Sequence, residues 1–433
     1  MITTPVRTLV CAWLRCAVVA LGLLAAGLPA RAAEPSPAEK LASSSRSTPL
    51  SPLPADRAKH LAELGVDGWH AMGALGRGVK IAVLDGGFRG YKQYLGTALP
   101  PDVTVRTFRK DGNFEGRNTQ HGILCAEVVH ALAPDAQLLL ANWEDDDADS
   151  FLRAVKWARD EGAKIISCSI IMPQLSDGEG GGPTHAALTK LLGSDMLLFA
   201  SAGNTAERHW AGPFHASSGG LHEWKPGVTD NLLTPWYDEK VSVELFCKPG
   251  SRYDLAVVDE DTGAEAARPA ANGGNLVARF EPKAGHSYGV RLRLVSGPGG
   301  SFHLVALHSE LAAGTRVGSV SFPADGAEVV AVGAVDHSGK RTSYSACGSA
   351  DGGTKPDLVA PVPFVSSWRS RPFAGTSAAA PQAAALAALV WSRHADWTAA
   401  PVRKLLQTSA RDLGIPGPDP ETGFGLVHLP GAK

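Results

Sequence analysis

Four residues along the chain carry side chains that together could perform acyl transfer. Asp85 lies in "AVLDGG", His121 in "TQHGILCAE", Asn204 in "ASAGN" and Ser377 in "GTSAAAP". A serine hydroxyl needs an imidazole to take its proton, and a carboxylate then fixes the imidazole tautomer and supports its positive charge. The tetrahedral intermediate also needs donors for its oxyanion, which the Asn204 amide and the Ser377 backbone N–H could supply. The sequence therefore predicts a nucleophilic serine with its base and acid.

The residues around Ser377 also predict a helix. The stretch "RPFAGTSAAAPQAAALAALVW" covers residues 371–391 and is dominated by small side chains. The first turn of a helix has unpaired N–H groups that favour developing negative charge, which suits a nucleophile. On this stretch alone, an N-cap role for Thr376 or Ser377 is the commoner explanation. The other three residues of the set favour the nucleophile.

Strands and helices alternate along most of the chain. Apolar strands are predicted at 79–87, 102–108, 136–143, 163–170 and 196–204, and helices at 121–132, 149–162 and 184–195. This rhythm predicts an α/β fold with a mostly parallel sheet and helices on both faces. Ligand sites in such sheets form at the carboxyl ends of strands, where Asp85, Ser169 and Asn204 stand.

The pattern changes between residues 212 and 317. Short runs of period two, such as "KVSVELFC" and "YDLAVVD", are separated by Gly, Pro, Asn and Asp. They predict an antiparallel β-sandwich or jelly-roll domain. The α/β pattern then resumes. We therefore expect a catalytic domain made of residues 60–211 and 318–433, with the β-domain 212–317 inserted into it.

The N-terminal 33 residues have the three parts of a signal peptide. Arg7 and Arg15 precede an apolar run, which ends before the small-residue site Ala30-Arg31-Ala32. We expect export to the periplasm or the extracellular medium, with cleavage near Ala32. A membrane anchor is the alternative, although this run is short for a membrane span and no later apolar run is long enough to span a membrane. Residues 34–59 are predicted to be a linker or short pro-segment.

Composition narrows the partners. The 41 Lys and Arg residues nearly balance the 43 Asp and Glu residues, which argues against a nucleic-acid partner. Four cysteines remain after the signal peptide, and three pairings are open to them as well as free buried thiols. They are Cys125, Cys168, Cys247 and Cys347.

In these motifs the chain resembles the subtilisin-like serine proteases, or subtilases, over residues 60–210 and 318–433. "GTSAAAP", the His-Gly pair at the start of a helix, "SAGN" and "FPADGAEVVAVGAVD" carry the resemblance. It implies a catalytic triad of Asp85, His121 and Ser377 and an oxyanion donor at Asn204. It also implies a substrate-binding edge, which would comprise Ser169, Ile170, Ile171 and Gly203.

Three positions depart from the family pattern. Gly86 stands where the family usually has Ser or Thr, which removes one hydrogen bond to Asp85. Ile123 replaces the Thr of His-Gly-Thr. The substrate strand usually reads Ser-x-Gly-Gly but here reads Ser169 followed by Ile170 and Ile171, and bulky side chains there would narrow the cleft.

Two further features have alternative interpretations. Cys125, one helical turn after His121, resembles the buried cysteine of the family's thiol-containing branch, and we expect it to pack without reacting. The acidic run "EDDDADS" at 144–150 is interpreted first as a solvated loop that complements a helix N-terminus, with Asp149 or Ser150 as N-cap. Selection of basic substrate residues and calcium binding are the alternatives.

The combined prediction is an exported serine endopeptidase that acts on protein or peptide substrates through an acyl-enzyme. No cofactor is required for this chemistry, no catalytic metal is expected, and structural calcium is possible without a located site. A subtilase-fold binding protein with little turnover is the alternative, and an esterase ranks last because no Gly-x-Ser-x-Gly elbow surrounds Ser377. The oligomeric state is left open.

Overall fold

The computed structural model describes residues 55–145, 147–236, 239–269, 275–349 and 353–431. The predicted signal peptide and residues 34–54 of the predicted linker lie outside these ranges. Helix α2 (Ala55–Glu63) begins inside the segment predicted as linker. Arg57 on this helix is buried and forms an ion pair with the buried Glu127, with 2.8 Å between Nη2 and Oε1. Residues 55–59 therefore belong to the fold.

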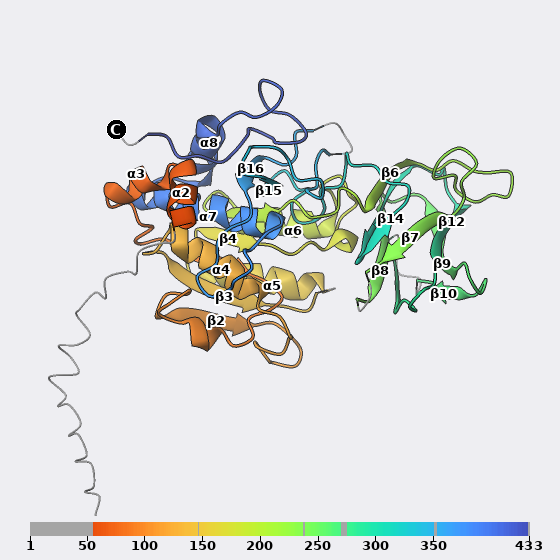
Figure 1. Cartoon of the computed structure of the whole chain (residues 1–433), viewed down its shortest axis with the longest axis horizontal. Helices are drawn as coiled ribbons and strands as arrows, with labels where there is room; N and C mark the ends of the chain where they lie inside the picture. The colour runs from red at the N-terminus through yellow and green to blue at the C-terminus, as the bar shows by residue number, and fades with distance from the viewer. Residues whose placement is uncertain (1–54, 146, 237–238, 270–274, 350–352, 432–433) are drawn as a thin grey trace, which may run out of the picture. The chain divides into compact units, whose positions relative to one another are not determined.

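A seven-stranded parallel sheet forms the centre of the α/β part (Figure 1). Its order is β16-β15-β5-β4-β1-β3-β2, and every neighbouring pair is parallel. Most of its strands are buried on both faces, which explains their continuous apolar runs. The prediction of a mostly parallel sheet is confirmed. The strands are β1 (Lys80–Leu84), β2 (Val103–Thr107), β3 (Gln137–Asn142), β4 (Ile165–Cys168), β5 (Leu197–Ser201), β15 (Val330–Val335) and β16 (Leu358–Pro361).

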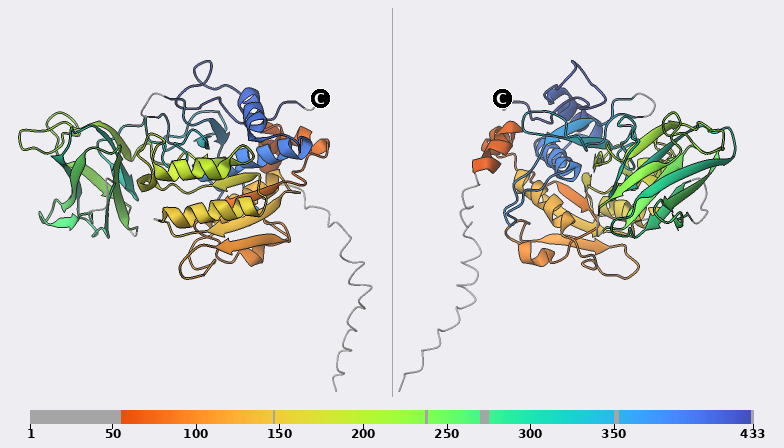
Figure 2. Two further views of the ribbon diagram at one scale, coloured as in Figure 1. Left: turned by 180° about the vertical axis from the view of Figure 1, so that it is seen from behind. Right: turned by 45° about the vertical axis from the view of Figure 1, so that its right-hand side comes forward.

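Helices cover both faces of this sheet, as Figure 2 shows from two further sides. Along β1, Ile81 and Val83 face one core, while Ala82 and Leu84 face the other. The first core is closed by α2, α3 (Val66–Ala71), α4 (His121–Leu132), α7 (Thr376–Arg393) and α8 (Ala399–Ser409), and the second by α5 (Ala148–Asp160) and α6 (Pro183–Leu192). Two 3-10 helices, η1 (Tyr91–Tyr94) and η2 (Pro173–Leu175), lie in the connections. No helix in the described ranges is both long and apolar enough to cross a membrane.

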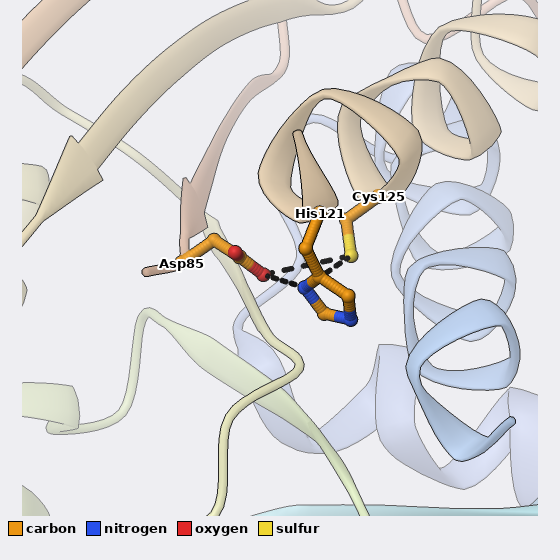
Figure 3. Close-up of side chains that lie close together, drawn as sticks. All are labelled: Asp85, His121 and Cys125. Carbon is orange, nitrogen blue, oxygen red and sulfur yellow. Dashed lines mark hydrogen bonds and ion pairs between the residues drawn. The ribbon is translucent and has the colours of Figure 1, made fainter. Parts of the chain in front are cut away.

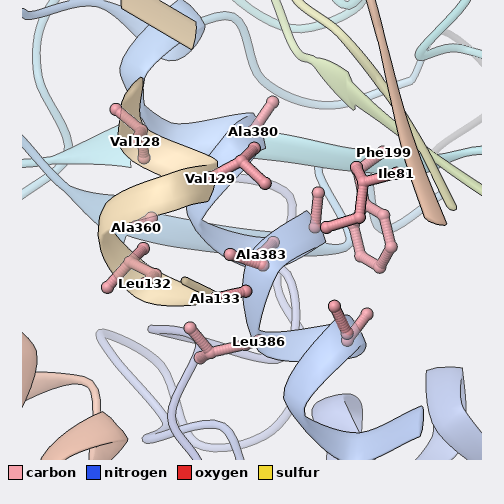
Figure 4. Close-up of a cluster of buried hydrophobic side chains, with 14 of the residues drawn as sticks. Ile81, Val128, Val129, Leu132, Ala133, Phe199, Ala360, Ala380, Ala383 and Leu386 are labelled. Carbon is pink, nitrogen blue, oxygen red and sulfur yellow. The ribbon is translucent and has the colours of Figure 1, made fainter. Parts of the chain in front are cut away.

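Helix α7 runs through the first core and is almost completely buried. It packs against α4 and against strands β4, β5, β15 and β16 (Figure 4). Alanine at Ala380 and Ala383 leaves room for α4 and the sheet to approach the α7 backbone closely. The small-residue pattern of the sequence thus serves close packing around the helix that carries Ser377.

Nine antiparallel strands in two sheets lie between β5 and β15 in the sequence. The strand orders are β10-β9-β12-β7-β14 and β11-β8-β13-β6. These strands have a separate hydrophobic core, which includes aromatic residues such as Trp210 and Phe302. The predicted antiparallel part is therefore present, and its strands span residues 209–311. They are β6 (His209–Pro213), β7 (Asn231–Pro235), β8 (Val241–Cys247), β9 (Arg252–Asp259), β10 (Glu265–Ala267), β11 (Leu276–Phe280), β12 (Tyr288–Ser296), β13 (Ser301–Leu307) and β14 (Ser309–Leu311).

The packing of α7 yields a stability prediction. Ala383→Leu inserts a larger side chain into a fully buried position between helices, so we expect the free energy of unfolding to fall by about 1–3 kcal/mol. Ala400→Leu on α8 is the matched control, because Ala400 is exposed and the same change should alter stability by less than about 0.5 kcal/mol. Chemical denaturation of both variants measures the difference, and equal losses would contradict the packing argument.

Candidate active site

Asp85 and His121 form the most direct contact of the site (Figure 3). Asp85 follows β1 and is fully buried, and its Oδ2 lies 2.7 Å from Nδ1 of His121, the first residue of α4. The His121 side chain remains 29% exposed, so its other ring nitrogen is free to meet a substrate. The remaining oxygen of Asp85 accepts a hydrogen bond from the Gly87 backbone N–H at 3.2 Å. The carboxylate therefore holds the imidazole in one tautomer.

Gly122 explains why a glycine follows the histidine. A Cβ at this position would lie 2.9 Å from the Asp85 Cβ and 2.5 Å from the Phe88 ring. Any side chain would push α4 away from β1 and lengthen the Asp85–His121 contact. Gly86 is different, because the nearest atom to a Cβ there would be 3.6 Å away. The space for a hydroxyl exists at Gly86, and the Gly87 N–H is the backbone donor that orients Asp85 without it.

The electrostatics of the pair favour the protonated imidazole. Burial alone would lower the pKa of His121, but the adjacent Asp85 carboxylate stabilises the imidazolium and raises the pKa well above 6.5. Burial also raises the pKa of the Cys125 thiol, which stays protonated at neutral pH. His121 is therefore a strong base, and Cys125 is a poor nucleophile.

Pro381 decides how Ser377 is held. In an α-helix the N–H of residue 381 would donate to the carbonyl of residue 377, but proline has no N–H. The Ser377 carbonyl instead accepts from Ser169 Oγ at 3.1 Å and from Cys125 Sγ at 3.7 Å. A single carbonyl thus joins α7 to the end of β4 and to α4.

The Ser377 hydroxyl donates to the Ser169 carbonyl at 3.3 Å. Within the described ranges, no hydrogen bond connects it to His121. Cys125 Sγ lies 3.9 Å from His121 Nδ1 and also contacts the Ser377 carbonyl. His121 and Ser377 therefore both lie next to the same cysteine. The N-cap of α7 is Gly375, without a side-chain cap, so neither Thr376 nor Ser377 has the capping role considered from the sequence.

Thr376 orients the predicted oxyanion donor. Asn204 Oδ1 accepts from the backbone N–H and from Oγ1 of Thr376, both at 3.0 Å. Thr376 Oγ1 also accepts from the Gly203 N–H at 3.2 Å. The Asn204 amide nitrogen is consequently the end that faces Gly375, where a Cβ would lie 3.1 Å from it. Gly375 has a φ of 87°, a conformation that favours glycine.

Sequence reasoning missed this role of Gly375 and Thr376. The "GTS" triplet contained the signal, since a glycine and a hydroxyl precede Ser377, but the sequence suggested only a capping role for Thr376.

A cavity of about 920 Å³ opens beside Ser377 and Asn204. The four residues predicted to bind substrate all line it, namely Ser169, Ile170, Ile171 and Gly203. A Cβ at Gly203 would lie 3.4 Å from Ile171, so this isoleucine packs against the edge of β5. The bulky side chains form a wall of the cavity and leave its volume open.

Most of the described residues of the acidic run 144–150 make local hydrogen bonds or ion pairs. Asp147 is the N-cap of α5, and its Oδ1 accepts from the Ser150 N–H at 3.0 Å. The predicted N-cap, Asp149 or Ser150, was therefore wrong by two or three residues. Asp145 forms an ion pair with Arg117, while Asp146 lies outside the described residues. These contacts favour the structural interpretation of the run.

Two groups of described residues bring possible metal ligands within 4.8 Å of one another. The first is Asp85, His121 and Cys125, which already bond to one another in the site. The second comprises Asp259, Asp261 and His286 in the antiparallel part. Asp259 there already accepts from His286 at 2.8 Å and from two backbone N–H groups. The possible structural calcium stays without a located site.

Comparison with known proteins supports the subtilisin-like assignment. The model of the Subtilase family matches residues 302–425, which contain Ser377. Subtilisin E from Bacillus subtilis (strain 168) is 38% identical over 102 residues, 22% of this chain and 25% of the relative. Subtilisin Savinase from Lederbergia lenta is 38% identical over 119 residues, 27% of this chain and 41% of the relative. The chain thus spans about a quarter of the length of the first curated relatives it matches.

Solved structures extend the similarity of fold to most of the chain. The CspB protease of Clostridium perfringens superimposes with a TM-score of 0.60 at 14% identity, over 86% of this chain and 97% of that one. A lanthipeptide protease superimposes with a TM-score of 0.50 at 18% identity, over 87% and 94% of the two chains. Identities this low establish the fold alone. The chain therefore has a subtilisin-like fold, and its segment 302–425, which contains Ser377, is similar to the Subtilase family.

The Asp85–His121 contact yields a pH prediction. A base must be neutral to take a proton, so kcat/KM should rise with pH through the raised pKa of His121, with a midpoint above 6.5. Asp85→Asn removes the carboxylate but keeps the burial, so the midpoint should fall. The same change should lower kcat about 10⁴-fold. Asp135→Asn, which removes an exposed partner of Arg77, is the control and should leave the profile unchanged. An unshifted midpoint in Asp85→Asn would refute this account.

The position of Cys125 yields a second prediction. A mercurial bound to its Sγ would displace His121 and Asp85, which lie 3.9 and 3.6 Å away, so peptidase activity should be lost. Cys125→Ala should be active and resistant, whereas Cys347→Ala, at another buried free thiol, should stay sensitive. Activity assays with and without p-chloromercuribenzoate test this, and inhibition that persists in Cys125→Ala would exclude the thiol as the target.

Proposed function

We propose that the protein is a serine endopeptidase in which Ser377 is the nucleophile, His121 the general base, Asp85 the orienting acid and Asn204 an oxyanion donor. The observation that carries the proposal is the 2.7 Å contact between buried Asp85 and His121, beside a serine in the first turn of α7. The match of the Subtilase family model to residues 302–425, which contain Ser377, supports it, as does the 38% identity to subtilisin E over 102 residues.

The proposed reaction uses groups that the fold already orients. The Ser377 hydroxyl rotates from the Ser169 carbonyl toward Nε2 of His121, which takes its proton as Oγ attacks the substrate carbonyl carbon. The oxyanion receives hydrogen bonds from the Asn204 amide and the Ser377 backbone N–H. His121 then protonates the leaving amine, and water, activated by the same imidazole, hydrolyses the acyl-enzyme. The first-turn N–H of α7 is available for this role because it has no acceptor within the helix.

The rotation of Ser377 is small in energy. A hydroxyl bond at 3.3 Å to a neutral carbonyl is long, and catalytic contacts commonly tighten only when substrate binds. A second candidate function, a binding protein with little turnover, is favoured by that same bond, because it holds the hydroxyl away from His121. The two candidates therefore differ in whether Ser377 is reactive.

We further propose that the enzyme acts on protein or peptide substrates after export and that its chemistry needs no cofactor. The signal-peptide pattern of residues 1–33 supports export. The balance of charges supports the absence of a nucleic-acid partner.

Labelling with a fluorophosphonate tests the proposed nucleophile. The reagent should modify Ser377, as mapped by mass spectrometry, and Ser377→Ala should abolish both labelling and the cleavage of a denatured protein substrate, with kcat reduced about 10⁶-fold. Ser392→Ala, on the same helix and bonded only to the Leu389 carbonyl, is the control that should retain both.

If folded protein is not labelled, either the cleft is closed to the reagent or Ser377 is unreactive. Ile171→Gly removes the side chain at the cavity wall and separates them. If this variant also fails to label, the proposed function is wrong and the binding-protein alternative stands.

A further inference from the structure

The cavity beside Ser377 has a wall that the antiparallel part supplies. Trp236 follows β7, Leu307 ends β13, and Glu310 and Leu311 belong to β14, and all four line the cavity together with Asn204 and Ser377. His121 is not among the lining residues. A leaving amine must reach His121 to be protonated, so the cavity receives the side chain on the other, acyl, side of the scissile bond.

Arg208 brings a positive charge into this cavity close to the reacting atoms. Its Nη2 donates to the backbone carbonyl of Asn204, the predicted oxyanion donor, and its guanidinium lies 4.5 Å from the centre of the Trp236 ring. The stacking and the hydrogen bond fix the planar group and leave its other N–H donors for a ligand. Among the described residues, no carboxylate forms an ion pair with Arg208.

Four other titratable side chains line the cavity, namely Glu207, His308, Glu310 and Tyr344. The first three are exposed, and Tyr344 is half-buried. Glu207 and Glu310 act on Arg208 through longer-range attraction, but burial is the larger effect and lowers the pKa of Arg208. The guanidinium is therefore a partly desolvated charge that the protein itself leaves incompletely compensated.

We propose that Arg208 is a specificity-determining residue that selects an acidic side chain, Glu or Asp, at the residue whose carbonyl Ser377 attacks. The proposal rests on the proposed function. A carboxylate in the cavity would meet the fixed guanidinium in a two-pronged contact away from bulk water, where such pairs are strongest. Because the stacking surface, Trp236, comes from the antiparallel part, that part takes a share in selecting the substrate.

A basic side chain could instead approach Glu207 and Glu310. Those carboxylates are exposed, so their attraction for a substrate is weakened by water and salt. An arginine or lysine that entered further would face the like charge of Arg208 at close range. We therefore expect Arg208, whose charge is less exposed than those of Glu207 and Glu310, to decide between acidic and basic substrate side chains.

The test uses quenched fluorescent peptides that differ only at the residue before the cleaved bond, with Glu, Gln, Lys or Phe there. Glu and Gln have the same shape, so the ratio of their kcat/KM values measures the effect of charge alone. We expect a Glu:Gln ratio of about ten or more in the wild type, as one charge-assisted pair provides. Arg208→Gln should reduce the ratio to about one, and Arg208→Lys should restore it only in part because an ammonium lacks the planar fork.

Matched variants keep the test specific. Glu310→Gln removes an opposing charge from the same cavity and should raise the Glu:Gln ratio, while Arg293→Gln, at an exposed position of β12 outside the cavity lining, should leave it unchanged. Fluorophosphonate labelling of Ser377 in Arg208→Gln shows whether the reacting groups are intact.

The outcomes separate the two proposals. Labelling at Ser377 with faster cleavage after Lys, Phe or Gln than after Glu would overturn the role of Arg208 and leave the peptidase proposal standing. A Glu preference that survives Arg208→Gln would also overturn it. No labelling and no cleavage in wild type and in Ile171→Gly would instead refute the peptidase function itself.

Discussion

The missing N–H of Pro381 is the constraint around which the site is arranged. Inside an α-helix each carbonyl normally has a donor four residues later, and a buried carbonyl without one is costly. The Ser377 carbonyl obtains donors from Ser169 and Cys125 instead. One backbone oxygen thereby ties the helix that carries Ser377 to the end of β4 and to the helix that begins with His121. The proline that would weaken an ordinary helix here leaves a carbonyl free for two tertiary hydrogen bonds.

This arrangement works only if the backbones approach closely, and small residues allow it. Gly122 brings α4 against β1, so that Asp85 and His121 meet at 2.7 Å. The alanines of α7 let α4 and the sheet pack against the same helix. Thr376, in the first turn of α7, holds the Asn204 side-chain oxygen, so that the amide nitrogen faces Gly375. The same small residues therefore allow both the tight packing of the core and the close approach of the polar groups in the site.

The sequence predicted the site residues well where they lie at the end of a strand or at the start of a helix. Asp85 directly follows an apolar strand and His121 opens a helix, so the parallel sheet and the order of the chemical groups could be predicted. The structural role of Arg57 could not be predicted from the sequence. Its polar segment resembles a linker, and only the fold shows that Arg57 pairs with Glu127 on a helix distant in sequence. The orientation of Asn204 and the contribution of Trp236 to the cavity were equally hidden. Both depend on contacts between segments far apart in sequence, which no local pattern encodes.

The site has two halves with different origins. The half proposed to react consists of Asp85, His121 and Ser377, which the parallel sheet and its helices hold in place. The cavity half is bounded by Arg208 and by side chains such as Trp236 from the antiparallel strands. A substitution in this second half alters the charge and shape presented to a substrate without moving the Asp85–His121 pair. Among the described residues, the segment between β5 and β15 therefore reaches the cavity without contacting the Asp85–His121 pair, and it meets the proposed reacting groups only where Arg208 donates to the Asn204 carbonyl.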